Sequence, residues 1–445
     1  MKKTAQIVIL LVLLAVFLFV GRNKLVAFYY NRGSDLYQRH SYKEAIGFLN
    51  KAVWLDPGNA GIHYTLGNAY LDGKLEEDAV KEYTKAIQSD SSFAWGYKAL
   101  AQIYLRRGSY AESLEVLKKA AAVIADNQQI LELADHVAYE YKASLVNSAV
   151  DAFLANDKDK AHALIDKALQ VDPDFAFASY LSGYFYYSEH KYGQAESMLK
   201  ESLREENRLF PAHSLLGDIY FEQKDFINAA KEYKAALSVN GKDAYVLNNL
   251  GLTCMNMENY QEALLFLKEA SRLEPKNVNI RYSLASVYRD NGKLDQAILE
   301  YKAVLNLRSD YPNAHNDLGD IYRQLGREPE AIEAYKNELS VGQSRLLAAP
   351  EDFVLLNSIA HAHNGLGEYD LAEEFIDKAL AVKPAYQEAY LTLAGIYKDS
   401  GKNRQALEAL EKAKGLSAQK YSFIERKIKD VKQLLSLMQD KAVLQ

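Results

Sequence analysis

The chain has 445 residues, a formal net charge of −6 and only eight prolines. Its positive and negative side chains are interspersed, which excludes the basic face that nucleic-acid binding requires. The single cysteine, Cys254, excludes a disulfide framework and a cysteine-based metal site. Scarce proline combined with helical periodicity predicts an all-helical protein, and the length allows a substantial core.

The N-terminus carries an apolar segment. Two lysines precede the uninterrupted apolar run Ile7–Val20. A membrane-crossing helix needs about 20 mainly apolar residues, so residues 4–21 are just long enough for a single-pass transmembrane helix. A cleaved secretory signal and a buried soluble helix are the alternatives, but no pair of small residues marks a cleavage site. We therefore predict that residues 1–25 form a membrane anchor.

The charges that flank this run bear on orientation. Lys2 and Lys3 favour a cytoplasmic N-terminus, whereas Arg22, Lys24 and Arg32 favour the opposite arrangement. A short basic N-terminus before an apolar run usually stays inside. The rest of the chain is therefore expected on the extracytoplasmic side.

The stretch Ala244–Asn277 contains two short amphipathic helices joined by a tight turn. Gly251 lies on the packing face of the first helix, and Ala263 and Ala270 lie on that of the second. These small residues let the two helices approach closely. The residues equivalent to Ala263, mostly 34 residues apart, are Ala45, Ala79, Ser113, Ala161, Ala195, Ala229, Ala297, Ala331, Ala372 and Ala406.

Two steps in this series are longer than 34 residues. The first long step contains residues 128–141, whose apolar spacing predicts an extra helical segment, either a plain insertion or a hinge. The second contains residues 346–352, which we interpret as a lengthened second helix followed by a loop. Both insertions leave the repeats on either side in register.

The 34-residue unit resembles the tetratricopeptide repeat. The family signature places Gly or Ala and then Tyr in helix A, followed by Ala, an aromatic residue, Ala and Pro in helix B. Two clear examples are Val26–Asn59, with Gly33, Ala45, Ala52 and Pro57, and Val278–Tyr311, with Leu284, Ala285, Tyr288, Ala297 and Tyr301. The resemblance implies an all-α, right-handed α-solenoid (superhelix) of about eleven helix pairs behind the N-terminal transmembrane helix.

The units divide the chain after the anchor. Units 1–3 occupy residues 26–127, units 4–9 residues 142–345, and units 10–11 residues 353–420. One departure from the signature is Glu338, which replaces the third small residue of its unit. Residues 421–445 carry an apolar stripe and are expected to form a C-terminal capping helix, with a partner-binding helix as the alternative.

No motif indicates catalysis, a cofactor or a metal. His361 and His363 are two residues apart, so on a helix they face different sides and cannot share one ion. The acidic residues are predicted on solvent faces, and most tyrosines fall at packing positions of the repeat. We therefore predict that the chain is not an enzyme.

The resemblance also implies a concave groove, lined by the first helices, that takes an extended peptide or a partner helix. Asparagine carries donors and an acceptor, so a row of asparagines can bind a peptide backbone; the alternative is that asparagine is merely tolerated there. Arg289 and Arg323 are placed to meet a carboxylate or phosphate. The candidate groove residues are Tyr245, Asn248, Asn249, Tyr282, Arg289, Asn313, Asn316, Asp320, Arg323, Asn357 and His361.

The sequence as a whole predicts a membrane-anchored scaffold that binds protein or peptide partners in its groove and organises an envelope complex. One alternative is a component of surface polysaccharide export or assembly that binds a glycan or a lipid carrier. Another is a non-catalytic part of an enzyme complex. The Lys and Asn arrangement of the family's two-carboxylate clamp is not found, so a chaperone co-factor is not predicted.

Overall fold

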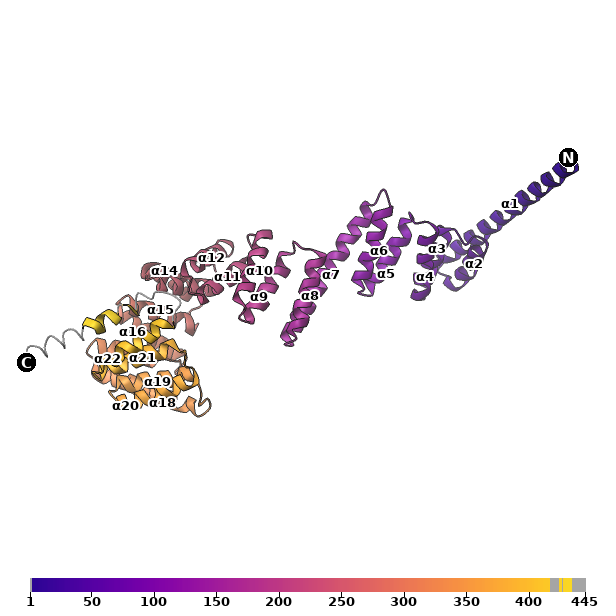
Figure 1. Cartoon of the computed structure of the whole chain (residues 1–445). Helices are drawn as coiled ribbons and strands as arrows, with labels where there is room; N and C mark the ends of the chain where they lie inside the picture. The colour runs from indigo at the N-terminus through magenta and orange to yellow at the C-terminus, as the bar shows by residue number, and fades with distance from the viewer. Residues whose placement is uncertain (1, 417–423, 426, 434–445) are drawn as a thin grey trace, which may run out of the picture. The chain divides into compact units, whose positions relative to one another are not determined.

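The computed structural model describes the backbone of residues 2–416, 424–425 and 427–433, and their side chains from Phe19 onward. Residues 2–416 form twenty-two helices, and none of the described residues forms a strand (Figure 1). In sequence order the helices form eleven pairs, each a first helix and a second helix joined by a short turn. The predicted all-α repeat architecture is confirmed.

The first helices are α1 (Lys2–Gln38), α3 (Ala60–Asp72), α5 (Ala94–Arg106), α7 (Gln128–Leu154), α9 (Ala176–Ser188), α11 (Phe210–Glu222), α13 (Ala244–Asn256), α15 (Val278–Asp290), α17 (Ala314–Gln324), α19 (Phe353–Gly365) and α21 (Gln387–Asp399). The second helices are α2 (Tyr42–Leu55), α4 (Glu76–Ser89), α6 (Tyr110–Val123), α8 (Lys158–Val171), α10 (Tyr192–Glu205), α12 (Phe226–Val239), α14 (Tyr260–Leu273), α16 (Leu294–Leu307), α18 (Glu328–Leu346), α20 (Tyr369–Val382) and α22 (Asn403–Gly415).

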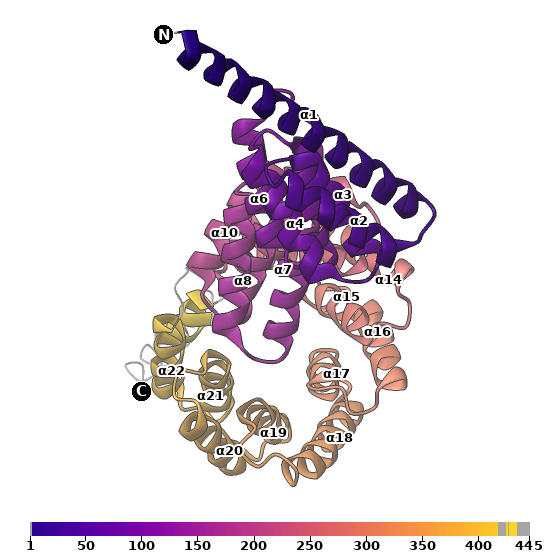
Figure 2. The same cartoon turned by 90° about the vertical axis from the view of Figure 1, so that its right-hand side faces the viewer.

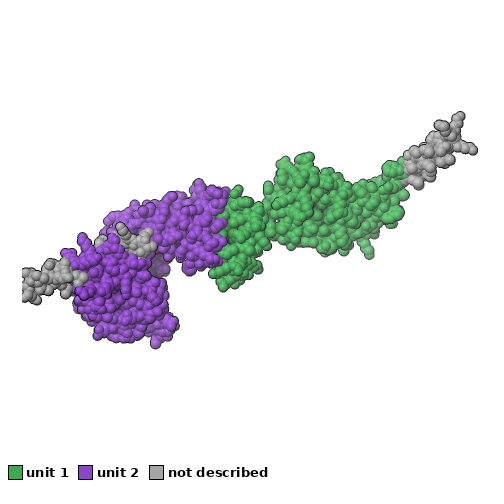
Figure 3. Space-filling model, viewed as in Figure 1, with its two compact units in different colours: residues 1–185 green, residues 186–445 purple. Residues whose placement is uncertain are grey.

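The chain divides into two compact units, residues 1–185 and residues 186–445, which we call unit 1 and unit 2 (Figure 3). In unit 1, residues 128–141 form the first half of α7, a continuous helix of 27 residues. In unit 2, α18 has 19 residues instead of the 14 of α16, and a loop follows it. The first insertion therefore lengthens a helix, whereas the second accompanies a longer α18 and forms the loop after it.

The first helix, α1, contains both the predicted membrane anchor and the first helix of the first repeat. It is one helix of 37 residues, so the apolar run Ile7–Val20 continues without a break into the first repeat. The side chains of residues 1–18 lie outside the described part of the structure. Among the residues whose side chains the structure describes, no helix combines the length and apolar character that a membrane crossing needs. The anchor stays a prediction.

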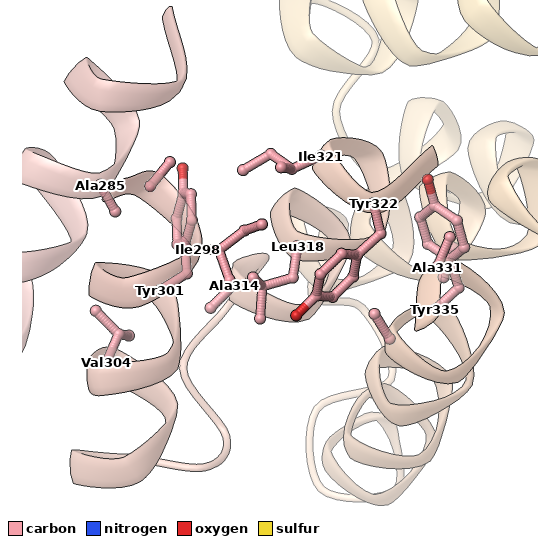
Figure 4. Close-up of a cluster of buried hydrophobic side chains, with 13 residues drawn as sticks. Ala285, Ile298, Tyr301, Val304, Ala314, Leu318, Ile321, Tyr322, Ala331 and Tyr335 are labelled. Atoms are coloured by element: carbon pink, nitrogen blue, oxygen red, sulfur yellow. The ribbon is translucent and has the colours of Figure 1, made fainter. Parts of the chain in front are cut away.

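The repeats of unit 2 are held together by small residues and buried tyrosines. Tyr301 and Tyr335 are fully buried in one cluster, among alanines from α15, α16 and α18 (Figure 4). Gly319 faces Tyr335 so closely that an added Cβ would lie 2.5 Å from Cε1 of the ring. The close approach of first and second helices that the sequence indicated is therefore realised by a glycine against an aromatic ring.

The described end of the chain packs onto the last repeat. Ile424, Ile428 and Val431 are buried against Ala409 and Leu410 of α22. Their burial covers apolar surface that the last pair would otherwise expose to water. The rest of the predicted capping helix, residues 417–423, 426 and 434–445, lies outside the described residues.

The expectation that acidic side chains face solvent was wrong for several residues. Glu82, Asp317 and Glu338 are buried. Glu82 contacts His63 at 2.6 Å, and Glu338 accepts a hydrogen bond from the Ser358 hydroxyl at 2.5 Å. Burial of a carboxylate requires such partners, and a single-sequence pattern does not show them when they come from a neighbouring helix.

Candidate partner-binding surface

The first helices α15, α17, α19 and α21 form one side of unit 2, which we call the inner face (Figure 2). The second helices α16, α18, α20 and α22 lie outside them. Side chains that leave the first helices away from the second helices therefore reach the inner face. This is the side on which the sequence places the candidate groove.

Tyrosine hydroxyl groups from second helices also reach the first helices. Tyr335 of α18 passes beneath Gly319, and its hydroxyl donates to Oδ1 of Asp320 at 2.6 Å. Because glycine has no Cβ, the ring can cross the helix–helix seam and present its oxygen to the residue that follows the glycine. Equivalent contacts join Tyr83 to Asn68 at 2.6 Å, Tyr233 to Asp218 at 2.7 Å and Tyr301 to Ser286 at 3.1 Å.

Asp218 of α11 links its own helix pair to the next first helix. It accepts hydrogen bonds from Tyr233, from the Tyr245 hydroxyl at 2.9 Å and from Nδ2 of Asn249 at 3.1 Å. Burial raises the pKa of Asp218 although these three donors oppose the shift. Tyr245 and Asn249, which were both predicted as groove residues, therefore donate hydrogen bonds to the same carboxylate. That carboxylate was not among the predicted residues.

Asp317 of α17 makes the same kind of link to α15. The Tyr282 hydroxyl donates to Oδ2 of Asp317 at 2.7 Å, and Arg289 forms an ion pair with the other oxygen. Burial would lower the pKa of Arg289, but the attraction of Asp317 raises it well above its usual value. Arg289 thus remains charged, and about a third of its side chain is exposed.

Asp320 lies between α17 and α19. Nε2 of His361 approaches Oδ2 of Asp320 at 3.1 Å, and Nη2 of Arg323 lies 3.6 Å from Oδ1. Burial alone would raise the pKa of Asp320, but the charge of His361, with the hydrogen bonds from His361 and Tyr335, lowers it to about 2. In turn Asp320 raises the pKa of His361, although burial opposes that shift.

Arg323 also reaches α21. Its Nη1 lies 3.8 Å from Oδ2 of Asp399, which accepts a hydrogen bond from Nδ2 of Asn364 at 3.0 Å. The three first helices α17, α19 and α21 are therefore joined by one continuous set of charged and amide side chains. Each of Asp320, Arg323 and Asp399 keeps between a third and two fifths of its side chain exposed.

The structure moves some predicted groove residues away from the surface. Asn316 is only 1% exposed, and its Nδ2 donates to the backbone oxygen of Ser358 at 2.9 Å. Asn316 therefore links α17 to α19 through a buried hydrogen bond, because these two helices pack directly against each other. Its prediction as a residue of the groove surface was wrong. Asn313 takes a left-handed conformation, with φ of 62°, as the N-cap of α17.

Two other asparagines have a mixed position. Asn248 and Asn357 are half-buried, and their amide oxygens have no hydrogen-bond partner among the described residues. Nδ2 of Asn248 donates to Asn249 at 3.2 Å. Asn249 and Asn316 therefore donate hydrogen bonds within the protein, whereas Asn248 and Asn357 each keep an amide oxygen without a partner among the described residues.

The inner face offers recognition chemistry. Its carboxylates are held by arginine, histidine, tyrosine and asparagine side chains. In the part of the chain that the structure describes, no three potential ligands gather closely enough to hold a metal ion. Asp218, Asp399 and Asn364 were missed from the sequence, although Asp218 occupies the same place after its glycine as Asp320 does.

Models of one repeat family match the chain at many of these helix pairs. Models described as TPR repeat or tetratricopeptide repeat match residues 33–73, 64–129, 210–243, 255–300, 285–326, 354–386 and 387–420. The chain is a tetratricopeptide repeat protein. The family identified from the 34-residue period is thereby confirmed.

Several curated proteins are similar in sequence. Hsp70-Hsp90 organizing protein 1 of Glycine max is 22% identical over 246 residues, which are 55% of this chain and 41% of that protein. The TPR repeat-containing protein YpiA of Bacillus subtilis is 22% identical over 248 residues, 55% of each chain. Anaphase-promoting complex subunit 7 of Mus musculus is 22% identical over 218 residues, 49% of this chain and 36% of that protein. The chain thus spans about half or less of the length of these relatives.

Several solved structures are also similar. Yeast Tom70 covers 95% of this chain, with 97% of its own chain covered, at 14% identity and a TM-score of 0.42. A tetratricopeptide repeat protein from Parabacteroides merdae covers 57% of this chain, with 98% of its own chain covered, at 17% identity and a TM-score of 0.46.

Proposed function

We propose that the chain is a scaffold that binds an extended segment of a protein partner on the inner face of unit 2. The observation that carries this proposal is the set formed by Asp320, Arg323, His361 and Asp399. These groups come from three consecutive first helices, are fixed by one another, and remain about a third exposed. Fixed but accessible polar groups bind with a small loss of side-chain entropy.

The geometry favours an extended partner. Packed helices are about 8–10 Å apart, and an extended chain rises about 3.3 Å per residue, so about three partner residues pass each first helix. Four first helices, α15 to α21, would therefore contact about a dozen residues. Because carboxylates and arginines alternate on this face, a partner segment with both signs of charge would be bound best.

We further propose that the scaffold is held at a membrane through residues 4–21, with the repeats on the extracytoplasmic side, and that it organises an envelope complex. The support is the apolar run, its flanking lysines and the uninterrupted helix α1. The names of two relatives, an organizing protein and a subunit of a complex, agree with a scaffold role.

Crosslinking of the full-length chain in membranes tests this function. We expect Arg323→Glu to remove most crosslinks between the inner face and a partner, because the change reverses a charge on that face. Lys336→Glu, a charge reversal on the exposed side of α18, is the matched control. Equal crosslinking by both variants, with helicity unchanged, would contradict the inner-face site.

Protease protection on the same membranes tests the topology. Cleavage of the repeats only after the membrane is opened, with the repeats in an enclosed extracytoplasmic compartment, is the expected result. Cleavage from the cytoplasmic side would reverse the proposed orientation. Recovery of the whole chain in the soluble fraction would contradict the anchor.

A further inference from the structure

The chain contains two tryptophans, and both lie in unit 1 in different surroundings. Trp95 begins α5 and is 58% exposed; Nζ of Lys98 lies 5.0 Å from its ring centroid, and the Tyr64 ring is 6.4 Å away. Trp54 lies near the end of α2 and is 81% exposed. Such exposure of the largest apolar side chain is costly in water, so the surroundings of Trp54 need an explanation.

Trp54 lies beside the point where α1 leaves the repeat. Nε of Arg22 donates to the backbone oxygen of Leu55 at 2.7 Å, and Nη2 lies 3.7 Å from Asp56. These contacts align the end of α2 with Arg22, two residues after the apolar run ends at Val20. Trp54 is therefore level with the first turn of α1 that follows the run.

Further large apolar side chains are exposed at the same end of unit 1. They lie on α1, which Figure 1 shows running on past the other helices of the unit. Together with Trp54 they form what we call the boundary surface, which consists of Phe19, Val20, Leu25, Phe28 and Trp54. Phe19 and Val20 are the last two residues of the apolar run, so the boundary surface continues that run along α1 and adds Trp54 from α2.

Positive charges accompany the boundary surface. Lys24 is exposed on α1, and Nζ of Lys51 lies 5.6 Å from the ring centroid of Tyr29 and 5.4 Å from that of Phe48. Tryptophan and tyrosine at the edge of an apolar segment, with lysine and arginine beside them, match the composition of the headgroup region of a bilayer. Lysine can keep its charge at the headgroups while its stem contacts the rings.

We propose that the boundary surface contacts the headgroup region of a lipid bilayer, so that the first repeat lies on the membrane. The proposal rests on the proposed anchor at residues 4–21. Since α1 is unbroken from Lys2 to Gln38, no flexible linker separates the anchor from the first repeat. The membrane contact therefore fixes the direction in which unit 1 leaves the bilayer.

Tryptophan fluorescence of the full chain tests this contact. The variant Trp95→Phe leaves Trp54 as the single tryptophan, and Trp54→Phe leaves Trp95 as the matched control. Each is incorporated into phosphatidylcholine and phosphatidylglycerol vesicles, with or without bromine on the upper part of the acyl chains. We expect brominated lipid to remove about half of the Trp54 emission, because its ring would lie at headgroup level, and to leave Trp95 emission unchanged.

Flotation of the same vesicles separates the two proposals. Flotation with quenching of Trp54 alone supports both. Flotation with equal emission of Trp54 in plain and brominated vesicles overturns the boundary contact and leaves the anchor standing; the surface would then be covered by protein, such as a second copy. Absence of flotation overturns the anchor and the contact that rests on it. If Trp95→Phe loses helicity, the difference in quenching between the unaltered chain and Trp54→Phe measures the same contact.

Discussion

Two helix pairs of unit 2, α13–α14 and α17–α18, have the same kind of seam, in which a glycine of the first helix faces a large side chain of the second. The two pairs differ in that side chain. An added Cβ on Gly251 would lie 2.5 Å from Cγ of Leu267, and one on Gly319 would lie 2.5 Å from Cε1 of Tyr335. Leu267 ends inside the seam, whereas Tyr335 carries its hydroxyl through to Asp320. The residue at this position of the second helix thus decides whether the contact between the two helices is purely apolar or also places a hydroxyl group beside a carboxylate of the first helix.

A larger side chain at the glycine of the seam should have the largest effect on stability. Gly319→Val places methyl groups where the Tyr335 ring lies, so we expect a loss of about 3 kcal/mol in the free energy of unfolding of unit 2. Gly251→Val should cost as much, because Leu267 is equally close. Urea unfolding followed by circular dichroism measures both.

The same seam can tolerate a smaller side chain. Ala285 occupies the equivalent position opposite Tyr301, so Gly319→Ala should cost clearly less than Gly319→Val, with a slightly longer Tyr335–Asp320 contact. If both valine variants were as stable as the unaltered chain, the close approach would not be a requirement of either pair.

Removing the hydroxyl of Tyr335 alone should show how much its hydrogen bond to Asp320 stabilises the α17–α18 pair. Leu267 of α14 makes no such bond. Tyr335→Phe keeps the ring in the seam but takes a hydrogen bond from a carboxylate, so we expect a loss of about 1.5–2 kcal/mol in unfolding free energy. Tyr322→Phe, in the same pair, removes a hydroxyl that does not donate to Asp320 and serves as the control. Equal losses in the two variants would mean that the contact with Asp320 adds nothing.

Protonation should give the smallest difference between the pairs. Asp320 raises the pKa of His361, so the charged imidazole stabilises the folded state fully below its unfolded pKa of about 6.5, and this stabilisation is lost as the pH rises through the raised folded pKa. Asp320 itself, with a pKa of about 2, stays ionised over this range.

His361→Gln should therefore cost at most about 1 kcal/mol near pH 5, since solvent screens a pair that is a third exposed, and close to nothing near pH 9. Unfolding midpoints at the two pH values measure this difference. The cost of Gly251→Val should be the same at both, because the side chain that faces Gly251 is Leu267, which does not titrate. A cost of His361→Gln that grows with pH would contradict the assigned charge of His361.

Much of the fold was predictable because it depends on local spacing. Gly251, Ala263 and Ala270 all lie in the core, as their period indicated. The spacing of residues 128–141 predicted extra helix, but it did not give the end of that helix. No proline or glycine interrupts residues 128–154, and α7 runs through all of them. The candidate site was predicted only as a face: Arg289, Arg323 and His361 lie on it, whereas Asn316 turned out to be buried.

By itself, the sequence determined the repeat, the family and the face of each helix, because these depend on periods within one helix pair. The tertiary structure alone decided which polar groups meet. Asp218 and Tyr245 are 27 residues apart and Asp320 and His361 are 41 apart, and only the stacking of successive repeats brings them together. A carboxylate becomes part of the inner face when a neighbouring first helix supplies its donor, and that depends on the packing of two repeats against each other.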